Sequence, residues 1–397
     1  MKIIKGGVTA PKGFLAGSTS CGIKKSGKTD LALLFSTTPC VTAGTFTTNR
    51  VKSGSVILSI ERLKKGSAQA VFVNSGNANC CVGKKEIKDA REITSLAARK
   101  LNLKSDSILI ASTGIIGRPL PVNKIKNGIK GLIQDLSKSN GTSFAKAIMT
   151  TDTVHKEIAV EINIKGKVVK AAGAVKGAGM ICPNMATMLA FFTTDAVIEK
   201  EALKQAFKES VYDSFNKITI DGDMSTNDSA IIFANSMAGN SVIKKNTRDY
   251  AIFLDAIKFV AKELSRKIVL DGEGATRFIE IIVKDAKKEI TAGSIARHIA
   301  NSNLVKTMIA GGDPNWGRIA ASAGASGVKI NSGRMDIYFG RALVMKNGAG
   351  VNVSRRLLLD IFRKKEIKIV VDLKSGKYVD RIWTCDLTEE YVHINAE

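Results

Sequence analysis

The sequence has few of the side chains that usually serve as catalytic bases. Its 397 residues include three histidines, His155, His298 and His393, and none of them lies in a motif shared with a serine, threonine or cysteine. An imidazole is the usual base for a hydroxyl or thiol nucleophile. The sequence therefore does not indicate a Ser–His or Cys–His pair, and a nucleophile in this chain needs its proton acceptor from another source.

Long apolar runs are also missing. The first residues, MKIIKGGVTAPKGF, lack the continuous apolar stretch of a signal peptide. No later segment approaches the roughly 18 apolar residues that span a bilayer. We therefore expect a cytoplasmic protein without a membrane partner. A chain of 397 residues with 44% hydrophobic residues is long enough for one large core or two layered domains.

Cysteine usage argues against a disulfide framework. The six cysteines include no CxxC pair, and Cys80 and Cys81 are adjacent, which is an awkward spacing for a bridge. We expect free thiols in a reducing compartment and no zinc site or other metal centre.

The charge balance is strongly positive, with 60 Lys and Arg against 36 Asp and Glu and a net charge of +24. Such a balance can indicate a nucleic-acid or anionic membrane partner. The basic residues are diffuse, however, with short clusters such as Lys364–Lys365 and no basic tail or aromatic-interleaved stripe. We expect no nucleic-acid partner, and a positive field that favours encounter with anionic amino-acid substrates.

One motif near the amino terminus indicates a different function. GIKKSGKT (22–29) satisfies the GxxxxGK[ST] pattern of P-loop NTPases, and IKIVVD (367–372) is a possible acidic-ended strand. A P-loop needs an apolar strand before the glycine and a helix after the threonine. Here the preceding LAGSTSC is small and polar, and the following DLALLFSTTP alternates like a strand and a turn. A P-loop NTPase that binds nucleic acid is therefore a remote alternative.

Apolar periodicity predicts a mixed α/β chain. Helical spacing occurs at 87–101, 122–138, 197–215, 248–266 and 288–304. Strand-like apolar runs occur at 69–74, 106–111, 157–164, 187–193, 229–234, 277–284 and 366–373. Sandwiched sheets with helices outside suit this order of elements.

The segment KGAGMICPNMATMLAF (176–191) contains a candidate nucleophile, Thr187, directly after the small residue Ala186. If the bond between them breaks, Thr187 gains an α-amino group with a pKa of about 7.7 to 8, close to its own hydroxyl. Nucleophile and base then belong to one residue. From the pattern alone, a glycine turn leading into a core strand, with Thr187 as an ordinary strand residue, stays an open alternative.

Motifs along nearly the whole chain resemble those of one enzyme family. They are GIKKSGKTDLAL (22–33), TAGTFTTNRVKS (42–53), VNSGNAN (73–79), ASTGIIGRPLP (111–121), MTTDT (149–153), 176–189, TIDGDMSTND (219–228), DGEGATRF (271–278), VKTMIAGGDPNWGRI (305–319) and WTCDLTEEYVHINAE (383–397). In this order they resemble the glutamate N-acetyltransferase / ornithine acetyltransferase family of arginine biosynthesis.

The resemblance implies a layered αββα-type sandwich and an autoprocessed N-terminal-nucleophile acyltransferase. Self-cleavage between Ala186 and Thr187 would give an alpha chain (1–186) and a beta chain (187–397) that stay associated, as a heterotetramer of two of each. The enzyme would transfer acetyl from N-acetyl-L-ornithine to L-glutamate through an acetyl-threonine intermediate. Acetyl-CoA is a possible second donor, and no metal or tightly bound cofactor is implied. A related alternative is an N-terminal-nucleophile hydrolase, such as an aminopeptidase.

The resemblance also assigns roles to residues outside the cleavage segment. Thr113 and Gly114 match the pair that stabilises the oxyanion, through a hydroxyl and a backbone N–H. The positions that match substrate contacts are Thr150, Lys176, Thr187, Glu273 and Asn395. A lysine supplies charge for a carboxylate and a glutamate for an ammonium. Without the resemblance, a glycine turn, a solvated lysine and a loop carboxylate are the ordinary interpretations of Gly114, Lys176 and Glu273.

Overall fold

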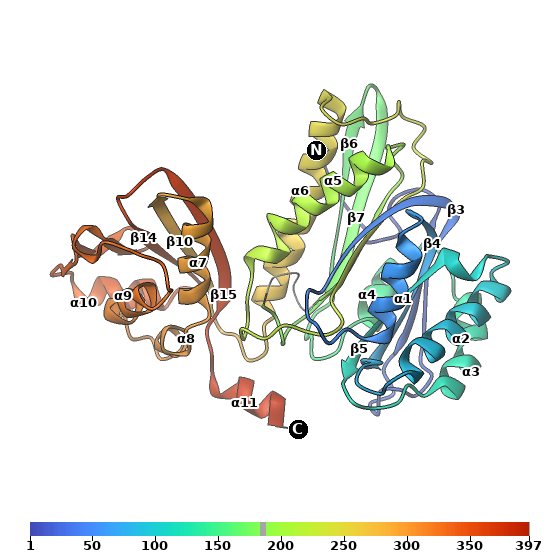
Figure 1. Cartoon of the computed structure of the whole chain (residues 1–397), viewed down its shortest axis with the longest axis horizontal. Helices are drawn as coiled ribbons and strands as arrows, with labels where there is room; N and C mark the ends of the chain where they lie inside the picture. Colours follow the sequence, from blue (N-terminus) through green and yellow to red (C-terminus); the bar gives the residue numbers. More distant parts are fainter. Residues whose placement is uncertain (183–187, 397) are drawn as a thin grey trace. The chain divides into compact units, whose positions relative to one another are not determined.

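The computed structural model describes residues 1–182 and 188–396. The chain divides into two compact units (Figure 1). Unit 1 comprises Met1–Gly177, Pro183–Asn216 and Met224–Ile268, and unit 2 comprises Ala178–Cys182, Lys217–Asp223 and Val269–Glu397. Both units are therefore assembled from segments on either side of the predicted cleavage site.

Unit 1 is built on one nine-stranded sheet in the order β1-β6-β7-β8-β9-β3-β4-β5, with β2 paired to β3. Its strands are β1 (Lys2–Ile4), β2 (Phe14–Thr19), β3 (Leu31–Phe46), β4 (Ser67–Asn77), β5 (Ile108–Ile115), β6 (Lys156–Ile164), β7 (Lys167–Lys176), β8 (Leu189–Thr194) and β9 (Ser229–Ala234). Its helices are α1 (Gly54–Leu63), α2 (Lys85–Lys100), α3 (Val122–Gln134), α4 (Gly141–Ala147), α5 (Lys200–Tyr212) and α6 (Arg248–Leu270).

The long strand β3 joins the two halves of this sheet. Its first part pairs with β2 and β4, and its last part, from Val41 to Phe46, pairs with β9. The register with β4 shifts between Phe35 and Cys40. Pro39 lies in this interval and has no N–H to donate to the ladder, which explains the irregularity.

Alternating side chains of β3 face two different cores. Leu31 and Leu33 pack in a cluster with α1, α2 and α3, which cover that face of the β3–β5 half. Ala32 and Leu34 point the other way, into a cluster that also holds Phe191 of β8. Because strands from both halves of the sheet contribute to this second cluster, the two halves face each other across a shared core.

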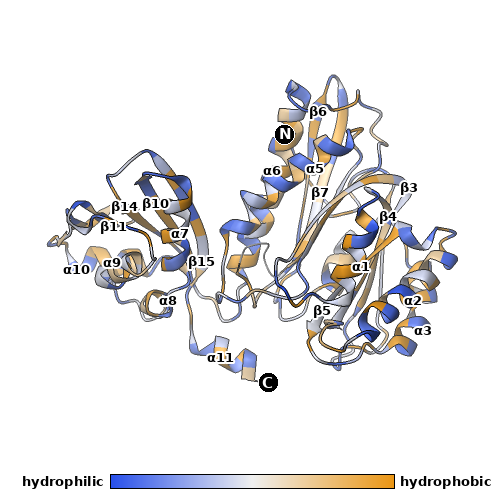
Figure 2. Ribbon diagram, in the orientation of Figure 1, coloured by the Kyte–Doolittle hydropathy of each residue, from blue (hydrophilic) through white to orange (hydrophobic). Residues whose placement is uncertain are grey.

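Helices α5 and α6 cover the outer face of the other half. Phe192 of β8 packs edge to face against Phe207 of α5, with ring centroids 5.2 Å apart. A Cβ at Gly173 of β7 would lie 2.8 Å from a methyl carbon of Leu264 in α6. The layers in unit 1 are helix, sheet, sheet and helix, which confirms the predicted αββα architecture. Helices α2 and α3 show both polar and apolar residues along their length, as amphipathic cover helices do (Figure 2).

Unit 2 has a six-stranded sheet in the order β13-β12-β11-β14-β10-β15. Its strands are β10 (Phe278–Ala286), β11 (Asp336–Phe339), β12 (Ala342–Lys346), β13 (Ala349–Gly350), β14 (Glu366–Asp372) and β15 (Tyr378–Cys385). Its helices are α7 (Glu289–Ala300), α8 (Asn303–Ala310), α9 (Trp316–Gly324), α10 (Arg355–Phe362) and α11 (Glu389–Ala396). Apolar side chains of β10 and β14 pack against α7 to form the core of this unit.

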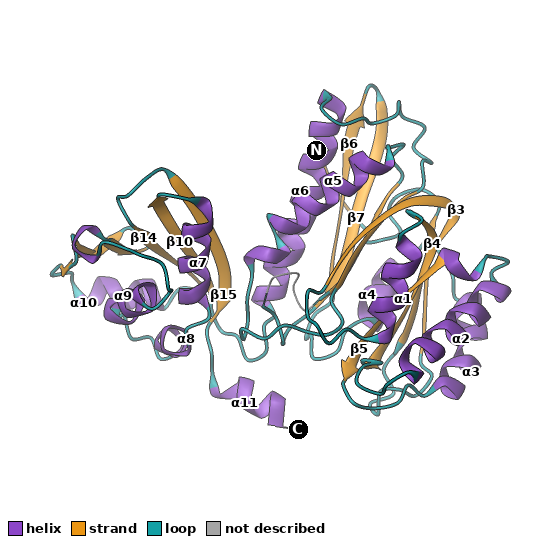
Figure 3. Cartoon of the chain, in the orientation of Figure 1, coloured by secondary structure: helices purple, strands orange, loops and turns teal. Residues whose placement is uncertain are grey.

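The P-loop alternative does not fit the structure of residues 20–31. The Asp30 carboxylate accepts backbone hydrogen bonds from Cys21 (2.8 Å) and Ile23 (2.6 Å), which folds GIKKSGKT into a turn. Strand β3, and no helix, follows this turn (Figure 3). A P-loop phosphate site needs the amino terminus of a helix at this point.

Elsewhere, all six cysteines are free. No helix in the described part of the chain has the length and apolar character to cross a bilayer.

Candidate active site

Thr113 and Gly114 lie near the carboxyl end of β5, where the chain leaves the sheet. Gly114 pairs with Gly76 of the parallel strand β4 and has a φ of +130°. A Cβ on Gly114 would lie 2.3 Å from the carbonyl carbon of Gly76, so a larger residue would push the two strands apart. Thr113 is buried, and its hydroxyl lies beside this exposed glycine.

Lys176, the last residue of β7, points its buried side chain at Thr113. Its Nζ donates a hydrogen bond to Thr113 Oγ1 at 3.2 Å. An ammonium group has donors and no lone pair, so Thr113 Oγ1 is the acceptor of this bond. The hydroxyl proton of Thr113 is then directed away from Lys176 and is free to reach an oxyanion, as the predicted role requires.

Asp152 connects this lysine to Thr150. Its Oδ1 accepts hydrogen bonds from the Lys156 ammonium (2.6 Å) and from the backbone N–H of Gly177 (2.7 Å), which follows Lys176. Its Oδ2 accepts the backbone N–H of Thr150 at 3.0 Å. Both Asp152 and Lys156 are buried. One carboxylate therefore fixes the backbone at Thr150 and at the end of β7.

The ionisation of these groups follows from their burial and from one another. Burial raises the pKa of Asp152, but the positive charges of Lys176 and Lys156 outweigh it and bring that pKa down to about 2. Burial lowers the pKa of nearby Lys24 to about 8, with the charges of Asp30 and Asp152 opposing the shift. The Lys24 Nζ donates to the carbonyl oxygens of Thr29 (2.8 Å) and Ala147 (3.3 Å). Lys24, Lys156 and Lys176 stand against the two carboxylates of Asp30 and Asp152, and the positive charge that remains suits a substrate carboxylate.

Asp228 is another buried carboxyl group in unit 1. It precedes Ser229, whose backbone N–H donates to the Met188 carbonyl oxygen at 3.0 Å. Burial raises the pKa of Asp228 well above the usual value. The Met188 backbone N–H, the charge of Lys176 and the Thr47 hydroxyl act in the opposite direction but do not outweigh burial. Neither oxygen has a partner of normal hydrogen-bond geometry among the described residues, and the Thr47 hydroxyl donates instead to the Ser225 carbonyl oxygen (2.8 Å). Burial therefore favours the neutral form of the Asp228 carboxyl group.

Glu273 and Asn395 come together in unit 2. The Asn395 Nδ2 donates to Glu273 Oε2 at 2.8 Å, and the backbone N–H of Glu273 donates to the Ala178 carbonyl oxygen at 2.8 Å. A Cβ at Gly179 would lie 2.3 to 2.5 Å from the atoms of the Glu273 carboxylate. Glycine at 179 thus lets the chain just before the predicted cleavage segment pass directly beside this carboxylate.

The structure brings most of the residues predicted from the motifs into two groups. Thr113, Gly114 and Lys176 lie together in unit 1, with Thr150 joined to them through Asp152. Glu273 and Asn395 form the second group, in unit 2. Ala186 and Thr187, the predicted cleavage position and nucleophile, lie outside the described residues. The catalytic and binding roles of all these residues stay predictions.

Sequence reasoning missed two buried carboxyl groups, those of Asp152 and Asp228. Asp152 lies within MTTDT and Asp228 within TIDGDMSTND, so both motifs were found but no role was given to their carboxyl groups. An acidic residue inside a run of small or apolar residues was the available signal. Among the described residues, no cluster of three or more His, Cys, Asp or Glu side chains is arranged to hold a metal ion.

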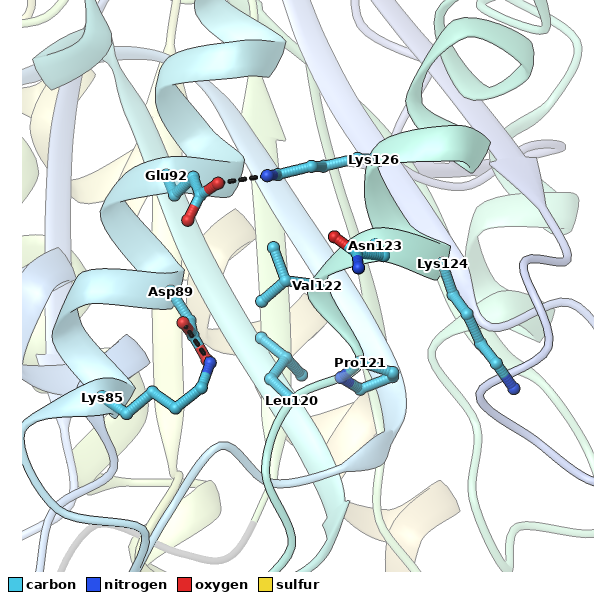
Figure 4. A pocket seen from close by; sticks show the side chains of 9 residues that line it. All are labelled: Lys85, Asp89, Glu92, Leu120, Pro121, Val122, Asn123, Lys124 and Lys126. Carbon is cyan, nitrogen blue, oxygen red and sulfur yellow. Dashed lines mark hydrogen bonds and ion pairs between the residues drawn. The ribbon is translucent and has the colours of Figure 1, made fainter.

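A surface pocket of about 410 Å³ lies between α2 and the start of α3 (Figure 4). Its walls carry two ion pairs, Lys85 with Asp89 and Lys126 with Glu92. None of the candidate catalytic or substrate-binding residues lines it. We assign this pocket no role.

The charge cluster around Asp152 predicts a specific pH dependence of stability. Its folded-state pKa of about 2 lies below that of the unfolded chain, so its contribution is fully present above about pH 4 and is lost as the pH falls toward 2. The shift corresponds to about 2 kcal/mol. The Thr187→Ala chain, which we expect to remain uncut, is a suitable background. Urea unfolding of this chain with and without Asp152→Asn should show a difference in the free energy of unfolding that shrinks by this amount between pH 4 and pH 2.

The exposed Asp360, which pairs with Arg363, offers a control for this measurement. Asp360→Asn in the same background should leave the stability curve nearly unchanged, because exposed pairs contribute little. If the difference in the free energy of unfolding between the chains with and without Asp152→Asn stays constant from pH 7 to pH 2, Asp152 is not the ionised, buried partner of the lysines.

Comparison with known proteins identifies the family. The ArgJ family model matches residues 15–397. A relative from Caldanaerobacter subterraneus, described as arginine biosynthesis bifunctional protein ArgJ, is 47% identical over 400 residues, covering 100% of this chain and 99% of the relative. A Methanocaldococcus jannaschii relative described as glutamate N-acetyltransferase is 44% identical over 409 residues, covering 100% and 99%.

A solved structure is similar as well. The crystal structure of arginine biosynthesis bifunctional protein ArgJ from Bacillus halodurans matches with a TM-score of 0.51 and 39% identity, and covers 53% of this chain and 99% of that chain. The full-length sequence matches and the motif order agree with this structural likeness. This chain belongs to the ArgJ family.

Proposed function

We propose that Thr187 carries an acetyl group from N-acetyl-L-ornithine to L-glutamate, after the chain has cleaved itself before this residue. Family membership makes the chain a glutamate N-acetyltransferase of arginine biosynthesis, and the proposal concerns which residues do the chemistry. One observation supports it most. The β7–β8 register pairs Lys176 with Leu189, two positions after Thr187 in the sequence, and the Lys176 ammonium reaches Thr113.

Self-cleavage supplies the missing base. The Thr187 hydroxyl oxygen attacks the Ala186 carbonyl carbon, the carbon–nitrogen bond breaks, and the proton lost by the hydroxyl passes to the departing nitrogen, which leaves an ester. Water then hydrolyses the ester, which releases the Ala186 carboxylate and restores the Thr187 hydroxyl. The new α-amine lies on the same residue as the nucleophile and titrates at about 7.7 to 8 in an ordinary chain, so it can accept the hydroxyl proton.

Acetyl transfer then runs in two half-reactions. Thr187 Oγ1 attacks the acetyl carbonyl of N-acetylornithine while its α-amine takes the hydroxyl proton, and ornithine leaves with that proton. The neutral amine of glutamate next attacks the acetyl ester and gives up one of its own protons, through the Thr187 α-amine, to the Thr187 oxygen as the ester bond breaks, which releases N-acetylglutamate and restores the hydroxyl. In both tetrahedral intermediates the oxyanion would be stabilised by the Thr113 hydroxyl and the Gly114 N–H, and one such donor is worth ~2.7 to 4 kcal/mol.

Substrate charges match the two groups of residues. Lys176 lies in the positive region around Asp152 and would hold the α-carboxylate shared by both amino acids, with Thr150, whose backbone Asp152 also binds, as a further contact. Glu273, held by Asn395, would hold an ammonium group. A hydrolase with the same nucleophile would pass the acetyl group to water. The family assignment favours transfer to an amino acid.

The two pieces would remain together after cleavage because they share a sheet. Strand β8, from the beta chain (187–397), pairs with β7 of the alpha chain (1–186), and β9 pairs with β3. Separating the pieces would break both ladders and split the shared core. Two copies of each piece would form the proposed heterotetramer in the cytoplasm. Acetyl-CoA as a second acetyl donor also belongs to this proposal.

Substitution of Thr187 tests the proposed nucleophile. Purified parent protein should run as two pieces of 186 and 211 residues, with Thr187 at the amino terminus of the second. Thr187→Ala should remain uncut and should transfer no acetyl from N-acetylornithine to glutamate, because it has no hydroxyl. Thr187→Ser should still be cut. Intact mass and transfer assays measure both results. Active parent protein that consists of the uncut chain alone would rule out the α-amine as base.

Substitution of Thr113 tests the oxyanion role. Thr113→Ala should lower kcat about 10²-fold or more and leave KM nearly unchanged, because the hydroxyl acts on charge present in the transition state. Thr113→Ser, which keeps the hydroxyl, is the matched control and should retain most of the activity. Steady-state kinetics with N-acetylornithine and glutamate give both constants. A normal kcat with a raised KM would instead place Thr113 in ground-state binding.

A further inference from the structure

The backbone at Met180 is held in an uncommon conformation shortly before the predicted cleavage position. Met180 has a φ of +54°, in the left-handed region that costs a residue with a Cβ about 1 kcal/mol or more. The carboxylate of Asp221 accepts the backbone N–H of Met180 at Oδ2 and that of Ile181 at Oδ1 (2.9 Å). Charge-assisted bonds of this kind offset the conformational cost.

The carbonyl side of Ile181 is fixed as well. Its oxygen accepts the backbone N–H of Ile220 (2.7 Å) and the hydroxyl of Thr219 (3.0 Å). Ile181 is therefore held at both its N–H and its C=O by three consecutive residues, 219 to 221. All of these contacts lie within unit 2.

Asp221 is itself held by the last helix of the chain. The Tyr391 hydroxyl of α11 donates to Asp221 Oδ2 at 3.2 Å. Burial and the negative charge of Asp221 raise the pKa of Tyr391, so its hydroxyl keeps its proton and remains a donor. Helix α11 makes a second connection through Asn395 to Glu273, whose backbone N–H donates to Ala178. Two routes thus join α11 to residues 178–181.

We propose that Asp221, held by Tyr391, is a positioning residue for self-cleavage and fixes the chain entering the Ala186–Thr187 segment. This inference rests on the proposed self-cleavage. Attack by Thr187 on the carbonyl before it requires an aligned bond, and a fixed entry to the segment removes conformations that cannot react. Because Tyr391 of α11 donates to Asp221, we expect α11 to contribute to this positioning.

The experiment follows cleavage of newly made full-length chain in a cell-free synthesis reaction, by the appearance of the 186-residue piece. Asp221→Asn keeps one acceptor oxygen and loses the other together with the charge, so cleavage should slow about tenfold or more. Tyr391→Phe removes one donor and keeps the ring, so cleavage should slow about threefold. Tyr378→Phe, an exposed tyrosine of β15, is the matched control and should be cut at the parent rate.

Two further measurements separate positioning from general damage. In the uncut Thr187→Ala background, Asp221→Asn should melt within about 3 °C of its parent, a small ΔΔG for a domain of this size. Once cut, the Asp221→Asn enzyme should transfer acetyl with a kcat within about threefold of the parent, because Asp221 acts before catalysis.

Three results would overturn the inference. They are cleavage of Asp221→Asn at the parent rate, a large drop in its melting temperature, or an equal loss of cleavage and of kcat in the cut enzyme. The proposed function fails separately, because a parent chain that transfers acetyl without ever being cut would contradict self-cleavage before any variant is compared.

Discussion

The geometry of the candidate active site depends on a buried carboxylate among lysines. Asp152 receives the ammonium of Lys156 and the backbone N–H groups of Thr150 and Gly177, and the charge of Lys176 helps to keep it ionised. A buried ion pair costs desolvation energy, and removing one partner leaves an unpaired charge that is strongly destabilising. Because breaking these contacts would leave the Asp152 charge unpaired, they hold the end of β7 and the MTTDT turn together. Lys176 can then meet Thr113, which lies 63 positions earlier in the chain.

Local patterns predicted the elements that have a strong period of their own. Helices such as α2 and α6 and strands such as β6 and β9 lie close to their predicted positions, because their apolar residues follow one spacing throughout. Strand β7 was missed because KVVKAAGAVK is rich in alanine and glycine and lacks a clear alternation. The turn predicted at STTP was wrong, because β3 absorbs Pro39 in an irregular stretch and continues to Phe46. Pairing with β9 outweighs the local turn signal there.

The motifs predicted which residues belong to the site, but not the contacts that hold those residues in place. The motifs identified Thr113, Lys176, Glu273 and Asn395, whereas the groups that hold them come from distant parts of the chain. Tyr391 reaches Asp221 across 170 positions, and no local pattern indicates such a bond. The glycines are intermediate cases. The sequence shows Gly114 and Gly179 within motifs, but only the fold explains why each position needs glycine. At Gly114 the backbone of strand β4 is too close for a Cβ, and at Gly179 the Glu273 carboxylate is too close.

The central claim is that Thr187 holds the acetyl group between two amino acids, and intact mass spectrometry tests it most directly. Enzyme incubated with N-acetylornithine alone should gain one acetyl mass on the fragment that begins at Thr187. Addition of glutamate should remove that mass and yield an equal amount of N-acetylglutamate. A fragment that never gains the acetyl mass while transfer proceeds, or one that loses it to water as acetate at the same rate with and without glutamate, would contradict the account.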